Sequence, residues 1–149
     1  MKLEEIKKRD QVLHCYFDGR DWNTNGEFEL KRRLVLKRTQ LLPKYPYIIE
    51  DEWEVIDGRA DLGCGDLVFT DGNGCFAIVE VKYIDSTPGA NARKKRNMKR
   101  NQVKEQASNY AKDYQKRLIF DEGNFIKSVE AFYFTNEYKE PQSIGSTLN

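Results

Sequence analysis

The sequence has a single histidine, only three cysteines and no long apolar run, and each shortage removes a class of function. His14 stands alone, so a structural or surface role is favoured over metal binding or general-base catalysis. Cys15, Cys64 and Cys75 are an odd number without metal-site spacing, which is typical of reduced thiols in the cytosol or nucleus. No segment could span a bilayer and the N-terminus lacks a signal-peptide apolar region. We therefore expect an intracellular protein, cytoplasmic or nuclear, that does not bind membranes.

Two short segments in the middle of the chain are the most informative part of the sequence. Residues 65–69 and 76–82 read as adjacent strands, joined by a turn rich in glycine, asparagine and aspartate. Alternation along a strand places Glu80 and Lys82 on the same face. If the turn has an odd number of residues or a bulge, Asp66 falls opposite Glu80 on that face, whereas an even turn separates them.

This arrangement predicts a site for chemistry on phosphate esters. The second strand is apolar on both faces, so charged side chains at its end need a partner. Two carboxylates and the carbonyl of Val81 are hard oxygen ligands of the kind that Mg²⁺ accepts, with Mn²⁺ as a substitute. Lys82 lies where it could orient or deprotonate a metal-bound water.

Asp66, a gap of thirteen residues and then Glu80-Val81-Lys82 resemble the core of the PD-(D/E)xK nuclease superfamily. The superfamily includes restriction endonucleases and the RecB and lambda exonuclease nuclease domains. The resemblance implies that Asp66, Glu80 and the Val81 carbonyl bind the metal and that Lys82 serves the attacking water. Gly65 replaces the proline of the family name.

A long helix is predicted over about residues 92–117, and its start is strongly basic. The whole chain has a net charge of +1, but seven basic residues between positions 93 and 104 contribute +7, so the remainder sums to −6. Such a cluster is usually a solvated face, or it serves as a nuclear address. Its place directly after Lys82 favours binding of a nucleic-acid backbone. The seven are Arg93, Lys94, Lys95, Arg96, Lys99, Arg100 and Lys104.

Farther along the same helix, Gln106 and Tyr110 are similar to the Gln-x-x-x-Tyr element of RecB-like and lambda-exonuclease-like members. At i and i+4 the two side chains share a face. The resemblance implies that Gln106 contacts the site or a phosphate, while Tyr110 anchors the helix against the core and borders the nucleic acid.

An earlier helix is predicted from Glu27 to about Leu41, capped by Thr24 or Asn25, with Lys31 among its solvent-facing residues. In the superfamily the first helix often contributes a glutamate to the metal site. Gly26-x-Phe28-Glu29 is similar to the family pattern and favours Glu29 slightly. Glu27 remains an alternative because it shares a face with the apolar residues of this helix, and acids at a helix start also favour its dipole.

The remaining elements complete a single domain over residues 1–149. We expect a charged helix over 1–14, strands at 52–56 and 128–135, and a loosely ordered tail over 137–149. The last strand follows a crossover helix and should pair in parallel. The order over about 27–135 resembles the αβββαβ core of the restriction-endonuclease-like α/β fold, a mixed central sheet flanked by helices.

The sequence thus predicts a Mg²⁺-dependent nuclease that hydrolyses phosphodiester bonds, with DNA favoured over RNA as its partner. Two alternatives stay open: an inactive nucleic-acid-binding module on the same fold, and an interaction protein in which Asp66, Glu80 and Lys82 form a structural ion network. Strandedness and end or internal cleavage are not predicted. A homo-oligomer or a larger complex is compatible with so small a domain.

Overall fold

The computed structural model describes residues 1–19, 26–122 and 125–146. These residues form a five-stranded sheet with the strand order β1-β2-β3-β4-β5. β3 and β4 are parallel and the other neighbours are antiparallel, so the sheet is mixed, as predicted. The strands are β1 (Tyr47–Glu54), β2 (Cys64–Thr70), β3 (Cys75–Lys82), β4 (Ser128–Thr135) and β5 (Gln142–Ser146).

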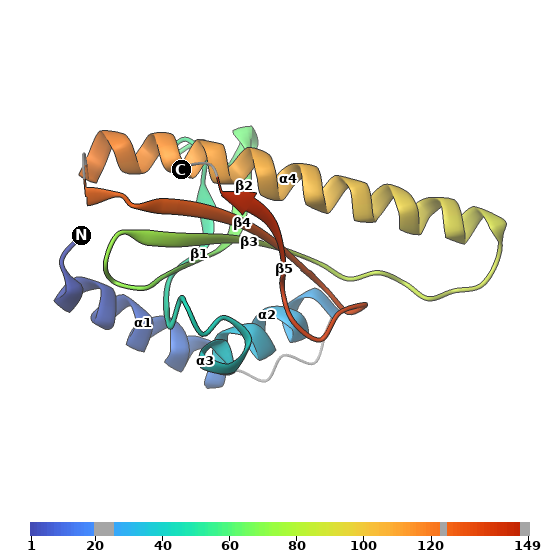
Figure 1. Ribbon diagram of the computed structural model, residues 1–149. Helices are drawn as coiled ribbons and strands as arrows, with labels where there is room; N and C mark the ends of the chain where they lie inside the picture. The colour runs from blue at the N-terminus through green and yellow to red at the C-terminus, as the bar shows by residue number, and fades with distance from the viewer. Residues whose placement is uncertain (20–25, 123–124, 147–149) are drawn as a thin grey trace.

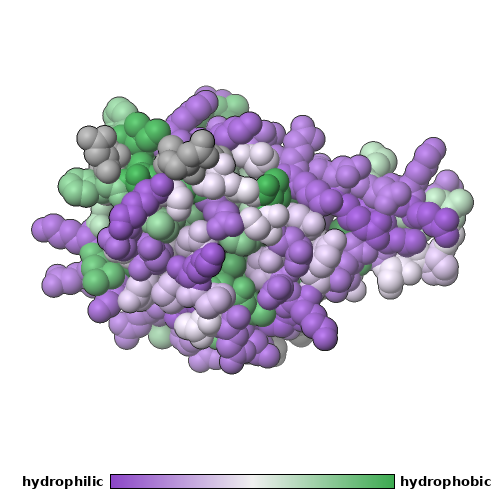
Figure 2. All heavy atoms as spheres, in the orientation of Figure 1, coloured by the Kyte–Doolittle hydropathy of each residue, from purple (hydrophilic) through white to green (hydrophobic). Residues whose placement is uncertain are grey.

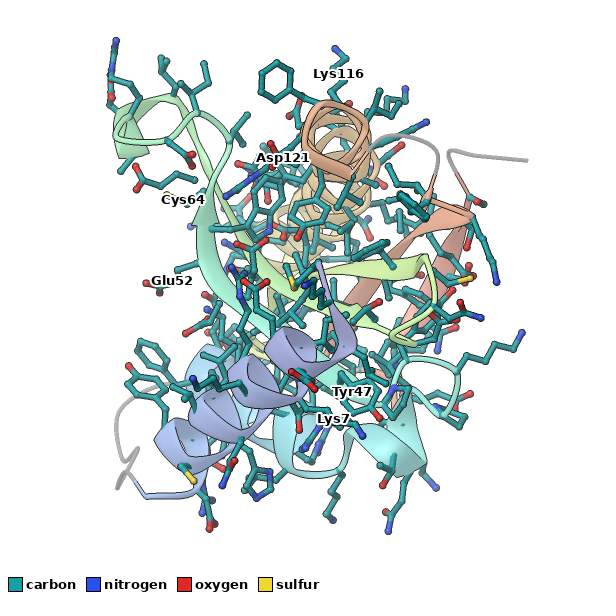
Figure 3. All side chains as sticks on the ribbon, turned by 90° about the vertical axis from the view of Figure 1, so that its left-hand side faces the viewer. Lys7, Tyr47, Glu52, Cys64, Lys116 and Asp121 are labelled. Carbon is teal, nitrogen blue, oxygen red and sulfur yellow. The ribbon has the colours of Figure 1, made fainter. Side chains whose placement is uncertain are left out.

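Helices cover both faces of the sheet. Figure 1 shows α4 (Ala90–Glu122) along one face, with α1 (Leu3–Asp18), α2 (Gly26–Leu36) and α3 (Arg38–Leu41) on the other side. Figure 3 looks nearly along α4 and shows the sheet between these two layers. A short 3-10 turn, η1 (Ala60–Leu62), precedes β2. The predicted α/β class with a mixed, helix-flanked sheet is therefore confirmed.

The core consists of one apolar cluster on each face of the sheet. Val79 and Val81 of β3 pack with Leu34 of α2, while Ile78 packs with Ala111 and Tyr114 of α4. This division follows from the alternation of side chains along a strand. It explains why β3 is apolar on both faces, as an interior strand must be.

Three predicted boundaries differ from the structure. The helix expected over 27–41 is divided at Lys37, whose backbone (φ −111°, ψ 24°) is not helical. The strand expected at 52–56 begins earlier, at Tyr47, directly after a proline that cannot continue a helix. The helix expected over 1–14 extends to Asp18. The suggested cap residues Thr24 and Asn25 lie outside the described residues.

The tail contains a strand that the sequence did not reveal. Residues 137–149 were expected to be loosely ordered, but β5 pairs antiparallel with β4. β5 is polar and mostly exposed, so it has no hydrophobic alternation. It pairs with β4 through its backbone, and Ser143 Oγ also donates to Glu130 Oε2. Residues 147–149 lie outside the described part.

α4 is longer than the sheet it covers. Its first buried side chain is Val103, so residues 90–102, here called the arm, bury none. At about 1.5 Å per residue the arm is about 20 Å long. It projects from one end of the molecule and its visible surface is almost wholly hydrophilic (Figures 1 and 2). No helix in the described ranges is long and apolar enough to cross a membrane.

Candidate active site

The β2–β3 hairpin brings the two predicted carboxylates together. Its register pairs Thr70 with Phe76 and leaves five residues in the turn, the odd number that this arrangement requires. Continued to the open end of the hairpin, the same register sets Asp66 opposite Glu80. The condition on which the sequence argument depended is therefore met.

Side chains replace the backbone ladder where β2 and β3 separate. Leu67 and Val79 are the last paired residues at this end. Beyond them, the backbone N–H of Asp66 donates to Glu80 Oε2 at 2.8 Å, and the backbone N–H of Val81 donates to Asp66 Oδ2 at 2.8 Å. Each carboxylate is thus fixed through one oxygen, and its second oxygen forms no hydrogen bond within the described residues.

The two carboxylates repel one another when both are ionised. Glu80 is only 3% exposed, and burial together with the neighbouring Asp66 raises its pKa to about 9. Burial also raises the pKa of Asp66, although Lys31 and the N–H of Val81 oppose the shift. Without a further cation, the pair therefore favours holding a proton at neutral pH.

Lys31 of α2 lies beside this pair, and its predicted exposure to solvent was wrong. The residue is 5% exposed, and its Nζ lies 3.1 Å from Asp51 Oδ1, 3.7 Å from Glu52 Oε1 and 3.7 Å from Asp66 Oδ1. Burial alone would lower its pKa, but the carboxylates of Asp66 and Asp51 outweigh burial and raise it. Lys31 is therefore a buried cation shared by several carboxylates.

The edge of β1 next to Asp66 has an unusual backbone. Asp51 pairs with Leu67 and Trp53 pairs with Gly65, so Glu52 lies opposite Asp66. Glu52 has a φ of 52°, in the left-handed region that non-glycine residues rarely adopt. Such conformations cost about 1–3 kcal/mol and cluster at functional sites.

Lys82 faces the start of α2, and this contact bears on the choice of helix glutamate. Its Nζ lies 3.7 Å from Glu27 Oε1, with both side chains partly exposed. The charge of Glu27 also contributes to the raised pKa of Asp66. Within the described residues, Glu29 makes no hydrogen bond or ion pair. The geometry thus favours Glu27 over the preferred Glu29, because Glu27 and Lys31 lie four residues apart on the same face of α2.

α4 borders the site through Tyr110. The ring of Tyr110 packs edge-on against Trp53, and burial together with Glu80 and Asp66 raises the pKa of its phenol. Gln106 lies one helical turn earlier and is half-buried, without a hydrogen bond among the described residues. Of the predicted Gln-x-x-x-Tyr pair, Tyr110 is therefore the member whose pKa is shifted by the two carboxylates.

The basic run divides into two groups. Arg96 donates to the carbonyls of Asp85 and Thr87, Arg100 forms a two-pronged ion pair with Glu137, and Lys104 lies over the ring of Tyr133. The side chains of the other members form no hydrogen bond or ion pair within the described part of the chain. These are Arg93, Lys94, Lys95 and Lys99, all on the arm.

The donor atoms suit a hard divalent cation. Asp66 and Glu80 offer oxygen ligands only, and each has an oxygen with no hydrogen bond. No group of three or more His, Cys, Asp or Glu placed to hold a metal occurs within residues 1–19, 26–122 and 125–146. Mg²⁺ commonly binds through one or two carboxylates and keeps several waters, so a two-carboxylate set fits it.

Sequence reasoning missed Lys31, Asp51 and Glu52 as neighbours of the site. The face that Glu27 shares with Leu30 and Leu34 was the available signal for Lys31, since that face is buried. Nothing in the sequence indicated the left-handed conformation of Glu52. Comparisons of the chain with protein-family models, with curated proteins and with solved structures found no match.

Proposed function

We propose that this protein is a metal-dependent nuclease with a restriction-endonuclease-like core, hydrolysing phosphodiester bonds of DNA. The observation that carries the proposal is the pair Asp66 and Glu80, held together where β2 and β3 separate, with Lys82 on the same strand. Buried carboxylates with raised pKa values are unfavourable unless a cation or proton joins them. Perturbed pairs of this kind are typical of functional sites.

Each residue has a distinct role in this proposal. Asp66 and Glu80, with the Val81 carbonyl, hold Mg²⁺, for which Mn²⁺ can substitute. A divalent cation held by these residues would supply Lewis-acid chemistry, offsetting charge on the scissile phosphate and acidifying a water molecule. Lys82 orients the attacking water, and Gln106 contacts the neighbouring phosphate.

Lys31 and Glu27 support these groups. Lys31 favours the ionised form of Asp66, because its ammonium lies 3.7 Å from that carboxylate and opposes the rise in its pKa that burial causes. Glu27 holds the Lys82 ammonium at the edge of the site through their 3.7 Å contact. Tyr110 closes the opposite side, and the arm offers cations to the nucleic-acid backbone.

The test is cleavage of labelled single- and double-stranded DNA and RNA with Mg²⁺, Mn²⁺ or EDTA. We expect metal-dependent products from the wild type, and at least a thousandfold slower cleavage, about 4 kcal/mol in barrier, after Glu80→Ala or Lys82→Ala. Glu54→Ala, at the partly exposed end of β1, is a control that should cleave normally. Products that persist in EDTA or in Glu80→Ala would contradict the proposal.

A structural ion network is the second candidate, because Lys31 already contacts three carboxylates. In that case Mg²⁺ would not raise the melting temperature, whereas the nuclease should be stabilised by a ligand that binds only the folded state. Retained, salt-sensitive DNA binding without cleavage would instead favour the inactive binding module.

A further inference from the structure

The segment that leaves β3, residues 83–89, runs beside the arm and has features that the cleavage chemistry does not use. An exposed aromatic ring follows Lys82 directly, and a pocket lined by cations follows the ring. Figure 1 shows this segment extending from the end of β3 to the tip of the arm.

Tyr83 is an exposed ring held in a fixed place. The residue is 43% exposed although it adjoins the buried end of β3. Its ring lies against the backbone of Gly26, because a Cβ added there would come within 2.1 Å of Tyr83 Cδ2. Glycine at position 26 therefore makes room for the ring. A rigid, solvent-exposed aromatic surface beside a phosphodiester site is suited to stacking on a nucleobase.

The segment after Tyr83 is anchored from both sides. The N–H of Ile84 donates to Asn136 Oδ1 at 2.6 Å, and Asn136 Nδ2 donates to the carbonyl of Ile84 at 2.9 Å. Arg96 of the arm donates to the carbonyl of Thr87. These contacts hold the segment in one position relative to both β4 and the arm, so a ligand need not order it.

A pocket of about 360 Å³ lies between the anchored segment and the arm. Asp85 accepts hydrogen bonds from the N–H and hydroxyl of Thr87, while Lys95 and Lys99 form no hydrogen bond or ion pair within the described residues. The pocket thus has surplus positive charge. Its lining residues are Asp85, Thr87, Ala92, Lys95, Arg96 and Lys99.

We propose that this groove binds one unpaired strand of nucleic acid, with a base stacked on Tyr83 and the backbone phosphates at Lys95 and Lys99. A positive groove combined with an aromatic platform is typical of single-strand binding. A base paired within a duplex does not offer its face to Tyr83, so the inference names single strands as the substrate class. Delivery of the strand to Asp66 and Glu80 rests on the proposed function, but binding in the groove does not require cleavage.

Lys95 and Lys99 lie on the same side of α4 as the residues that border the candidate site. Lys95 and Lys99 lie four residues apart, and seven residues farther along comes Gln106, followed by Tyr110 after four more. At 3.6 residues per turn these spacings keep all four on one side of α4. A strand lying along this side would therefore lead from the arm to the carboxylates.

The first experiment places tryptophan at the stacking position. Tyr83→Trp is titrated in EDTA with oligothymidine, oligouridine and a blunt DNA duplex while its fluorescence is compared with that of the wild type. We expect both single strands, or one of them, to quench the added tryptophan, and the duplex to leave it unchanged. Phe120→Trp is the matched control, since Phe120 is exposed near the other end of α4, and no strand should quench it.

The second experiment tests the lysines by binding. Lys95→Ala combined with Lys99→Ala should weaken single-strand binding on the order of tenfold at 0.1 M salt, and should reduce the salt slope by about 1.4. Lys112→Ala combined with Lys116→Ala is matched in helix, spacing and charge, and should change affinity less than twofold. Figure 3 shows Lys116 directed away from the sheet.

Equal quenching by duplex, no quenching at position 83, or equal losses in the two lysine pairs would overturn the inference. If the protein fails these binding tests but still cleaves, the proposal of a single-strand groove is wrong and the proposed nuclease function stands. If the protein passes the binding tests but does not cleave in Mg²⁺, the proposed nuclease function is wrong and the single-strand groove stands.

Discussion

Two partly buried charge clusters in this protein differ in their charge balance. Around Arg38, each guanidinium nitrogen has a partner: the group donates to Asp10 Oδ2 and to the carbonyls of Val35 and Pro46, and it contacts His14. The second oxygen of Asp10 accepts from a backbone N–H of β1. This cluster ties α1, α3 and β1 together with its charges balanced.

Around Asp66 and Glu80 the charges are not balanced. Two carboxylates share one place, and the nearest cation, Lys31, is closer to Asp51 than to Asp66. Stability alone gives no reason to bury such a pair, because removing charges from water costs several kcal/mol per ion. The two clusters therefore differ in charge balance rather than in burial, and the imbalance at Asp66 and Glu80 is what the proposed metal site would relieve.

The largest effect on stability is expected at the balanced cluster. Arg38→Met leaves Asp10 buried without its cation, and should lower the free energy of unfolding by about 3–5 kcal/mol. Urea unfolding followed by circular dichroism measures it. Arg9→Met removes an exposed i, i+4 pair with Glu5 and should cost less than about 1 kcal/mol. Similar losses in the two variants would show that the Arg38 cluster is not structural.

At the Asp66–Glu80 cluster, removing a charge should instead raise the free energy of unfolding. The folded-state pKa of Glu80, about 9, lies above its ordinary value of 4.5, so the folded protein binds more protons than the unfolded chain between these values. The contribution of Glu80 to the free energy of unfolding is therefore fully present below pH 4.5 and is lost as pH rises toward 9. In metal-free buffer, Glu80→Gln should become more stable than the wild type by about 1–3 kcal/mol between pH 5 and 8.

Thermal unfolding over that pH range measures this difference. Saturating Mg²⁺ should reduce it, because the metal stabilises the ionised carboxylates of the wild type. Glu54→Gln, at a partly exposed strand end, is the control and should follow the wild type. A Glu80→Gln variant that is less stable than the wild type at pH 8 would show that the carboxylate is needed for the fold.

The smallest expected effect is on the cleavage rate, when one of the two glutamates at the start of α2 is replaced. In the part of the chain that the structure describes, only Glu27 of the two contacts a residue of the proposed site. Glu27→Gln removes the charge facing Lys82 and should slow cleavage about tenfold, equivalent to about 1.4 kcal/mol. Glu29→Gln should change the rate less than twofold. Single-turnover cleavage at saturating protein measures both. If Glu29→Gln were the slower variant, the family-like pattern would outweigh the geometry.

Much of this fold is encoded in local patterns. The hairpin of β2 and β3 could be predicted because alternation and an odd turn fix its register, and α4 because its apolar stripe has helical period. Lys31 could not be placed, since a lysine on an amphipathic helix reads as solvent-facing unless its distant carboxylates are known. β5 has no side-chain signal at all, because it depends on the free backbone edge of β4.

The site shows the same limit. Asp66 and Glu80 lie within one hairpin, so spacing alone brings them together, whereas Lys82 on the same strand contacts Glu27 of α2. Glu27, Glu52 and Tyr110 reach the same place from other elements, and their approach depends on tertiary packing and, for Glu52, on a left-handed backbone. Local spacing therefore predicted the centre of the site, and long-range packing decided its rim.

The unequal burial of α4 divides one continuous helix into two levels of local stability. Residues 103–118 are held by the core and their amides should exchange with solvent only through large openings. The arm has helical hydrogen bonds but no buried side chain, so its amides should exchange through local fraying. Because the two parts share one backbone, ordering of the arm by any partner extends the protected helix outward from the core, one turn at a time.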